Sequence, residues 1–265
     1  MKGAGLRLTF LGTGTSFGIP QIGCSCATCT SSDPRDKRSR VAAVVESASG
    51  TRVLIDTPPE LRLQLISAGI DTVDAVFFTH DHADHTNGID DVRAISVRRA
   101  GPLDFFGPAA ALARIAKRFD YIFDDSIQPL PGTSKPQGRL RPVEPGSSVV
   151  VGDLQASAIA LPHGPGHVFG YRFGPLAYVT DASDVPDDVV AALRGVDVLV
   201  LNALFHRGHP MHLSIPGAIG VARAVGAGRT YLTHLSHENL HARLMEELAP
   251  NIHPAYDGLV VEVSA

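Results

Sequence analysis

The densest group of potential metal ligands is the segment Thr79–His85, which reads Thr-His-Asp-His-Ala-Asp-His after an apolar run. In an extended or turning segment alternate side chains point the same way, so His80 and His82 can bind one cation. Asp84 and His85 can then turn toward a second cation. Imidazole and carboxylate ligands favour zinc, manganese or iron over calcium or magnesium. A polar surface loop is the weaker interpretation, because four ligand-type residues at this spacing are rare by chance.

A second group of potential ligands is the cysteine loop, residues 23–29, which holds all three cysteines of the chain, Cys24, Cys26 and Cys29. Three neighbouring thiolates repel one another unless a cation binds them or they stay protonated. A structural zinc ion normally takes four ligands, so the fourth must come from another segment, and His237 is our candidate. The alternative is three free thiols, which a reducing compartment permits.

The elements that position these groups are short apolar runs rich in Val and Ile, separated by turn residues. They predict strands at Leu6–Gly12, Ala42–Ser47, Arg52–Asp56, Ala75–Thr79, Leu103–Phe106, Ser148–Val151, Gln155–Leu161, Val168–Phe173, Ala177–Thr180, Val196–Leu201, Thr230–Thr233 and Gly258–Val263. Helical patterns, three of which begin with proline in the first turn, predict helices at Pro59–Ala68, Ile89–Arg99, Pro108–Phe119, Pro186–Leu193, Ile215–Val225 and Glu238–Leu248.

The order of these elements indicates the architecture. Consecutive strands across residues 148–180 fit poorly with a strict alternation of strand and helix. We therefore expect two mainly β layers covered by helices on the outside, in a single domain over residues 1–265. The Pro- and Gly-containing segment Asp124–Pro145 is expected to be a surface loop or part of a lid.

The composition limits the class of protein. The chain has 265 residues, of which 44% are hydrophobic and 19% charged, so it can bury a substantial core. Its 23 Lys+Arg against 27 Asp+Glu give a net charge of −4, without the basic field of a general nucleic-acid binder or a polybasic membrane tail. We expect neither a transmembrane helix nor a signal peptide. Three clustered cysteines argue against a disulfide framework, so we expect a cytoplasmic protein.

The motif pattern resembles the metallo-β-lactamase superfamily, whose members are αββα-sandwich hydrolases that usually hold two metal ions at one edge. The resemblance rests on the His-x-His-x-Asp-His segment and on four further segments in the family's order, Leu54–Thr57, Leu161–Gly164, Val179–Asp181 and Leu232–His234. It implies an α+β fold of two mixed β-sheets flanked by helices.

The resemblance also implies a role for individual residues. It assigns the first metal ion to His80, His82 and His163, the second to Asp84, His85 and His234, the bridge between them to Asp181, and the orientation of the histidine loop, without ligation, to Asp56. Three alternatives stay open. His167 could replace His163, Asp181 could merely cap the turn before Asp184, and His234 could be a core histidine.

The cysteine loop narrows the resemblance to the phosphoribosyl cyclic phosphodiesterases of the PhnP type. The segments Leu11–Thr15 and Ala255–Gly258 are also similar to that branch. Its members hydrolyse cyclic phosphodiesters and form dimers. The resemblance therefore implies a small cyclic or simple phosphodiester as substrate, two divalent ions (zinc or manganese) at the active site, one structural zinc ion and a homodimer.

The expected chemistry follows from charge. Two divalent cations outweigh the charge of Asp84, Asp181 and one bridging hydroxide, so the site attracts a phosphodiester anion. Two metal ions also lower the pKa of a shared water, whose hydroxide attacks phosphorus. Asp181 and His212 are the predicted catalytic residues, with His212 as the acid that protonates the departing alkoxide. His206 and His209 lie close by in the sequence and stay open as alternatives.

Two further segments have an open interpretation. Backbone N–H groups of Gly12–Gly18 could cradle a phosphate, or the segment could be a flexible turn. A basic stretch could guide an anionic substrate or form a solvated face; it contains Arg35, Lys37, Arg38 and Arg40.

Rival functions are a nuclease similar to the tRNA 3′-processing enzymes, a thioester or lactam hydrolase, and a non-catalytic metal-binding protein. The negative net charge and the lack of an arm-like insertion dense in Lys and Arg disfavour a nuclease. The other hydrolases do not explain the cysteine loop together with His212. We therefore predict a dimetal phosphodiesterase without a membrane partner, and we expect no nucleic-acid partner.

Overall fold

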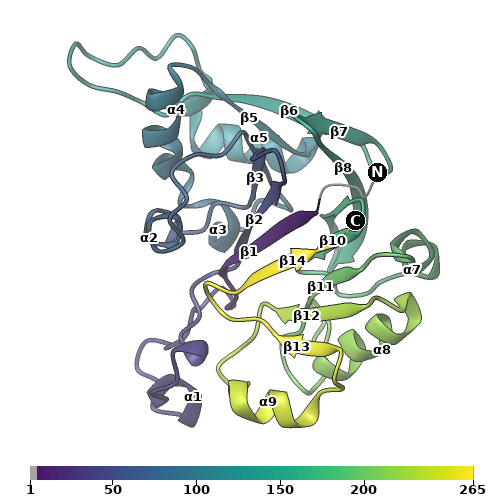
Figure 1. Ribbon diagram of the computed structural model, residues 1–265. Coiled ribbons are helices and arrows are strands. Elements are labelled where there is room, and N and C mark those ends of the chain that lie inside the picture. The colour runs from purple at the N-terminus through teal and green to yellow at the C-terminus, as the bar shows by residue number, and fades with distance from the viewer. Residues whose placement is uncertain (1–4, 265) are drawn as a thin grey trace.

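The computed structural model describes residues 5–264, so residues 1–4 and 265, the two ends of the predicted domain, lie outside the described part. Over these residues the strands form two seven-stranded sheets with helices on both outer faces (Figure 1). Both sheets contain antiparallel and parallel pairs. The predicted fold of two mixed sheets flanked by helices is therefore confirmed.

The first sheet combines the N-terminal strands with the last strand of the chain. Its order is β14 (Val260–Val263), β1 (Leu6–Gly12), β2 (Ala42–Ser47), β3 (Arg52–Ile55), β4 (Ala75–Phe77), β5 (Leu103–Pro108) and β6 (Gly138–Val143). The pairs from β14 to β3 are antiparallel, and those from β3 to β6 are parallel.

The second sheet repeats this scheme. Its order is β13 (Ile252–Pro254), β12 (Arg229–Thr233), β11 (Val198–Asn202), β10 (Leu176–Val179), β9 (Gly166–Phe173), β8 (Leu154–His163) and β7 (Ser148–Val151). The pairs from β7 to β10 are antiparallel, and those from β10 to β13 are parallel. Carboxyl ends of parallel strands meet at one edge of a sheet, which is where polar groups can gather into a site.

Helices cover the outer face of each sheet. The first sheet carries α2 (Leu61–Ser67), α4 (Arg93–Arg99), α5 (Ala109–Arg118) and α6 (Asp120–Phe123), and the second carries α7 (Asp187–Leu193), α8 (Ile215–Val225) and α9 (His241–Glu247). Two further short helices, α1 (Ala27–Thr30) and α3 (Ala83–Thr86), and the 3₁₀ turns Pro34–Asp36 and Ile89–Val92 lie in the connections. In Figure 1, α1 lies beyond the sheets, on the same side as α9.

Hydrophobic packing holds the layers together. A central cluster between the sheets includes Phe10, Phe77 and Tyr171, all nearly inaccessible to solvent. Two outer clusters pack the helices onto the sheets, for example through Leu61 and Leu193. Burying such side chains contributes roughly 1.5–3 kcal/mol each, so the three clusters give the sheet edges a rigid base.

Most predicted elements occur within one to three residues of their expected bounds, but two strands and three short helices were missed. β6 lies inside the segment Asp124–Pro145 that we expected to be a loop or lid, and only residues 124–137 of that segment form a projecting loop. The sequence of β6, Gly-Arg-Leu-Arg-Pro-Val, carries two arginines and a proline, which suit an edge strand and hide the strand pattern. Within residues 5–264, no helix is both long and apolar enough to span a membrane.

Candidate dimetal centre

Three of the predicted site residues follow strands in a left-handed backbone conformation. Asp56 (φ +63°) follows β3, Asp181 (φ +63°) follows β10, and His234 (φ +55°) follows β12. This conformation costs a non-glycine residue on the order of 1–3 kcal/mol and concentrates at functional sites. It turns the chain abruptly at the carboxyl ends of the strands, so that these side chains lie at the edge of the sandwich.

The structure brings the seven predicted ligands into two adjoining clusters. In each cluster the potential ligand atoms lie within 4.8 Å of one another; the first contains His80, His82, His163 and Asp181, and the second contains Asp84, His85 and His234. Oδ2 of Asp181 also lies 3.4 Å from Nε2 of His85 and 3.5 Å from Nε2 of His234. Asp181 therefore faces both clusters.

Unpartnered ring nitrogens aim into this centre. Nε2 of His80, His85, His163 and His234 is buried without a hydrogen-bond partner among the described residues. The opposite nitrogens of the first three are engaged, because Nδ1 lies 3.0 Å from Thr79 Oγ1, 2.7 Å from Asp56 Oδ2 and 3.0 Å from the Met211 carbonyl oxygen, respectively. A hydrogen bond at Nδ1 fixes the ring and leaves the Nε2 lone pair for a cation. The residues fit a pair of divalent metal ions.

The pKa values of His85 and Asp181 are shifted in opposite directions by the charges of their neighbours. Burial alone would lower the pKa of His85, but the carboxylates of Asp181 and Asp84 raise it well above its usual value. Burial would raise the pKa of Asp181, but His234 and His85 bring it well below its usual value. The buried carboxylates thus depend on nearby positive charge, which a bound cation supplies directly.

Asp56 lies one step behind the cluster. It is buried, and its Oδ1 accepts the backbone N–H of Thr79 while its Oδ2 accepts the Thr79 hydroxyl, each at 2.9 Å. Its Oδ2 also accepts the Nδ1–H of His85. Asp56 therefore touches the start of the histidine segment and one of its rings, the positions expected of a residue that orients ligands.

The geometry separates the alternatives that the sequence leaves open. His163 is buried in the first cluster, whereas His167 is exposed on β9. Asp181 faces the imidazoles, whereas Asp184 is exposed and accepts the N–H of Val185. His234 is buried, but both of its ring nitrogens are unpartnered, which sets it apart from a satisfied core histidine.

Among the three histidines proposed as the acid, only His212 reaches the centre. Its Nδ1 lies 3.8 Å from Oδ2 of Asp181, and its ring stacks on that of His234 with centroids 4.7 Å apart. His209 is the next ring outward, and His206 pairs with Glu247 instead. Asp181, His212 and His234 also form a third group of ligand-type atoms within 4.8 Å, so geometry permits a ligand role for His212 too.

Two supporting residues were not predicted. Thr79 bridges Asp56 and His80, and its place next to the His-rich motif is a signal that could have found it. Asn202 ends β11, and its side chain bonds both the N–H and the carbonyl oxygen of Ala182, which follows Asp181. A polar residue at the end of a fully buried apolar strand is a usable signal for such a role.

The family model described as a beta-lactamase superfamily domain matches residues 51–235, which contain both ligand clusters. The chain belongs to the metallo-β-lactamase superfamily. Members of this superfamily are hydrolases that depend on divalent metal ions, and the predicted resemblance is confirmed.

Three individual proteins show how similar the chain is to known members and relatives of this superfamily. A crystal structure of a diphosphatase from the PhnP family is 38% identical to the chain, and the match covers 98% of each chain with a TM-score of 0.89. An octanoyltransferase of Porphyromonas gingivalis is 38% identical over 256 residues, but the chain spans only about half (51%) of that protein. The short form of human tRNase Z is 20% identical over 97% of this chain and 99% of its own, with a TM-score of 0.68, and shows the fold alone.

The cysteine loop forms a separate cluster in this superfamily member. Sγ of Cys24, Cys26 and Cys29 lies 3.2, 3.7 and 4.0 Å from Nδ1 of His237, respectively. The four ligand atoms lie within 4.8 Å of one another, which suits one tetrahedral zinc ion. The N–H groups of Gln21 and of Cys29 donate to sulfur atoms within the loop. The predicted fourth residue, His237, thus lies beside the three cysteines.

The structure bears on two other interpretations of the sequence. The N–H groups of Gly14, Phe17 and Gly18 bond to oxygens within the protein, so these three groups are not available to a phosphate, which favours a turn. The basic stretch is a solvated face only in part, because Arg35 is exposed whereas Arg38 is buried. Arg38 is 1% exposed and pairs with Asp36 at 3.4 Å, and the other three members are held by Asp33, the Cys29 carbonyl oxygen and Glu60.

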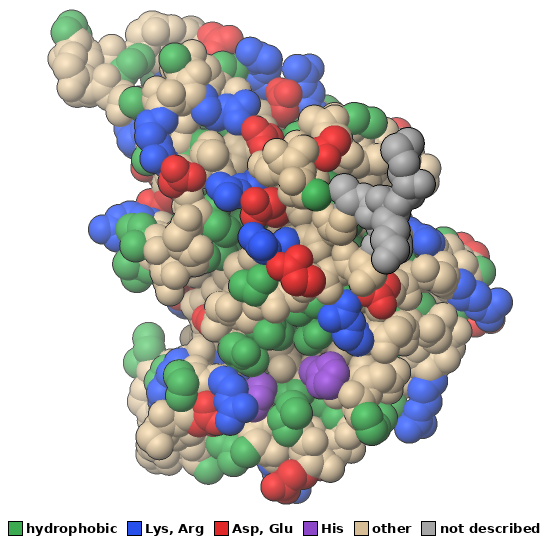
Figure 2. All heavy atoms as spheres, in the orientation of Figure 1, with side chains coloured by type: hydrophobic (Ala, Val, Ile, Leu, Met, Phe, Trp, Pro, Cys, Tyr) green, Lys and Arg blue, Asp and Glu red, His purple; other side chains and the backbone are tan. Residues whose placement is uncertain are grey.

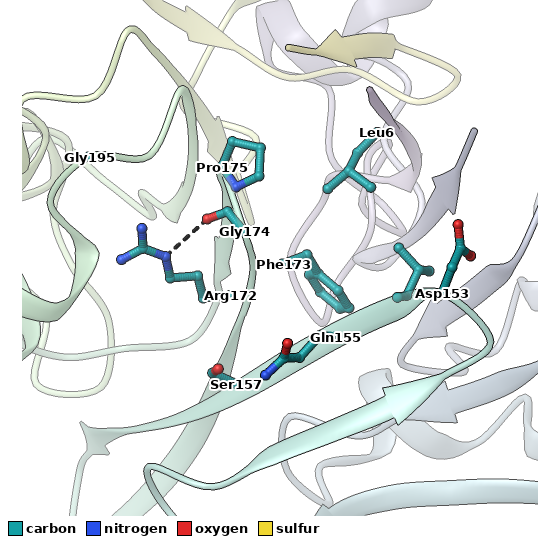
Figure 3. A pocket seen from close by; sticks show the side chains of 10 residues that line it. Leu6, Asp153, Gln155, Ser157, Arg172, Phe173, Gly174, Pro175 and Gly195 are labelled. Atoms are coloured by element: carbon teal, nitrogen blue, oxygen red, sulfur yellow. Dashed lines mark hydrogen bonds between the residues drawn. The ribbon is translucent and has the colours of Figure 1, made fainter. Parts of the chain in front are cut away.

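A large cavity of about 500 Å³ lies apart from the metal clusters and shares none of their residues. Figure 3 shows its lining, in which Arg172 turns toward its own loop and its Nε–H donates to the Gly174 carbonyl oxygen at 3.0 Å. The lining contains neither histidine nor cysteine.

Proposed function

We propose that this protein is a dimetal phosphodiesterase that cleaves small cyclic or simple phosphodiesters. The observation that carries the proposal is the position of Asp181. Its Oδ2 lies 3.4–3.8 Å from ring nitrogens of four histidines, namely His80, His85, His234 and His212. One carboxylate shared by so many imidazoles is suited to bridge two cations with an additional histidine beside them.

Different residues would bind the metal ions and orient their ligands. When bound, two divalent ions supply a Lewis acid and lower the pKa of a water molecule. His80, His82 and His163 would hold one ion, Asp84, His85 and His234 would hold the other, and Asp181 would lie between them. Asp56 and Thr79 hold the rings of His85 and His80 in the orientation that keeps Nε2 available.

His212 would deliver the proton to the leaving group. Burial and the neighbouring His234 lower the pKa of His212 to about 3, so the ring is neutral at neutral pH in the protein alone. A phosphate anion next to the ring favours the protonated form and raises this pKa. Once protonated beside the bound substrate, His212 would release its proton to the departing alkoxide.

Two relatives suggest competing substrates. The PhnP-family diphosphatase favours phosphoryl chemistry, and its name suggests the diphosphate linkage, a phosphoric anhydride, as a second phosphoryl substrate. The octanoyltransferase favours a second candidate, hydrolysis of an acyl thioester. Because the chain matches only half of that protein, we rank thioester hydrolysis below phosphodiester hydrolysis.

The surface gives little support to a nuclease. Lys and Arg side chains alternate with Asp and Glu on the face that Figure 2 shows. The loop over residues 124–137 projects from the body in Figure 1, but it contains one lysine, Lys135, against Asp124 and Asp125. An RNA-binding arm needs clustered positive charge.

The decisive experiment is turnover by protein loaded with manganese or zinc. We expect release of nitrophenolate from bis(p-nitrophenyl) phosphate, loss of this activity on chelation, and loss in the Asp181→Asn variant. Asp184→Asn is the matched control, since Asp184 is exposed and outside both clusters. Activity on an octanoyl thioester without activity on the diester would favour the second candidate. No turnover of either substrate by fully metallated protein would favour a non-catalytic role.

The homodimer stays a prediction, and sedimentation of the purified protein would test it.

A further inference from the structure

A cavity of about 170 Å³ opens beside the dimetal centre. His212 and His234 form the part of its lining that belongs to the centre, and Phe17 and Phe205 line it as well. Among the residues that line it, none is Lys, Arg, Asp or Glu. A group that enters this cavity from the metal centre therefore meets aromatic and neutral surfaces.

One wall of the cavity is a row of rings. The ring of Phe205 lies 5.9 Å from that of His209, which lies 5.3 Å from that of His212 at an interplanar angle of 25°. His212 in turn stacks on His234 at 26°. The guanidinium of Arg207 covers Phe205 at 4.0 Å. This wall of the cavity is therefore aromatic, with the ring of Phe205 tilted at 58° to that of His209.

Phe17 is exposed to solvent, at 71% of its accessible surface, although phenylalanine is usually buried. It lies in a turn that is closed by the N–H of Gly18 donating to the Thr15 carbonyl oxygen at 2.9 Å. Nε–H of Arg40 donates to the carbonyl oxygen of Ser16 in the same turn, at 3.1 Å. Phe17 also lines the cavity, so a group that enters from the metal centre can contact its exposed ring.

The turn is tied to the metal centre. The carbonyl oxygen of Thr13 accepts the N–H of Leu235 at 2.9 Å, and Leu235 follows His234. The hydroxyl of Thr13 donates to Asp257 at 2.8 Å, and Asp257 also accepts the N–H and hydroxyl of Ser39. Phe17 is therefore presented from a braced segment, at a fixed position relative to the histidines.

We propose that this cavity binds a planar aromatic ring of the substrate, an aryl group or a nucleobase, with Phe17 and Phe205 as the residues that select it. The inference rests on the proposed phosphodiester function, whose substrate class it narrows. The volume suits one ring, since an apolar cavity of about 150 Å³ holds benzene. The ring belongs to the departing group, because His212, the proposed acid, lines the same cavity.

The experiment measures binding with two non-hydrolysable ligands, phenylphosphonate and methylphosphonate, by calorimetry on metal-loaded protein. Both carry the same anionic group for the metal centre and differ only in the ring. Stacking on an aromatic side chain predicts roughly tenfold tighter binding of phenylphosphonate. Phe17→Ala and Phe205→Ala should each reduce this ratio, and the double variant should bring it near one. Phe17→Leu, which keeps apolar area without a ring face, should fall between.

Leu130→Ala is the matched control, because Leu130 is a large apolar residue, 75% exposed, on the projecting loop. Its ratio should equal that of the unmodified protein, and metal content should be equal in all variants. A ratio below about twofold in the unmodified protein, or an unchanged ratio in the double variant, overturns the aromatic cavity. Turnover of bis(p-nitrophenyl) phosphate is measured in parallel. A preserved ratio without turnover would refute the proposed function and leave the cavity assignment standing.

Discussion

The substitution Asp56→Asn tests how a residue that touches no substrate controls the metal centre. Oδ2 of Asp56 lies 2.7 Å from Nδ1 of His85, and the carboxylate can only accept, so Nδ1 carries the proton. Nε2 of His85 faces Asp84 and Asp181, so it is the ring nitrogen that would bind a cation together with those carboxylates. The size of residue 56 hardly changes in this variant, whereas the direction of its hydrogen bonds does.

In the variant, the side-chain amide replaces a carboxylate that accepted hydrogen bonds from Thr79 and His85. Oδ1 can still accept the N–H of Thr79, but the amide nitrogen would lie against Nδ1 of His85. An N–H donated to Nδ1 moves the ring proton to Nε2 and removes the lone pair that a cation needs. Loss of such a supporting contact lowers metal affinity roughly 10–100-fold, or about 1.4–2.7 kcal/mol.

The assay is competition with a fluorescent chelator, together with elemental analysis and the midpoint of thermal unfolding. We expect weaker binding of one ion of the pair and proportionally lower turnover. Asp153→Asn is the control, because Asp153 is exposed and accepts the Ser47 hydroxyl away from the clusters. If Asp56→Asn binds metal and turns over substrate like the unmodified protein, the tautomer argument is wrong.

Four other substitutions probe separate parts of the structure. Asp181→Ala should lose metal and lower diester turnover by at least about 100-fold, and near-normal rates would refute its bridging role. Cys26→Ser should lower zinc content and the thermal midpoint more than the chemical step, and unchanged zinc stoichiometry would exclude the cysteine site. Burial, with the cations Arg35 and Arg38, lowers the pKa of His241 to about 4, so the unfolded chain binds the extra proton between about pH 6.5 and 4. As the pH falls through this range, the unfolding free energy should therefore decrease by on the order of 2 kcal/mol because of His241. Chemical denaturation of His241→Gln should show a smaller change of unfolding free energy with pH, and an equal change in both proteins would contradict the assignment. Gly14→Ala should cost roughly 1–3 kcal/mol in denaturant melts, because a Cβ there would lie 2.6 Å from the Arg38 carbonyl oxygen, and an unchanged midpoint would show that the segment yields.

Local patterns in the sequence predicted the parts of the fold that are defined locally. Leu6–Gly12 and Ala42–Ser47 coincide with β1 and β2, because β1 alternates Leu and Phe with Arg7 and Thr9 and β2 begins with four apolar residues, and both are strand patterns. β6 escaped because an edge strand tolerates charge and proline. The three-residue β13 was too short to show a pattern.

The sequence by itself also determined which segments carry ligand-type residues, several of which, such as those of Asp56, Asp181 and His234, follow an apolar strand. It favoured His212 over His206 and His209, and His163 over His167, but left the others open, because these candidates share one segment and one residue type. Nor could it show that Arg38 is buried, since a run of basic residues has the same local pattern on a surface as in an interior. Those choices depend on which strand ends meet across the sandwich. The pairing of β10, β11 and β12 places Asp181 and His234 at one edge, facing the histidine segment that follows β4. Contacts between segments a hundred or more residues apart arise from sheet order and packing, so only the tertiary structure decides them.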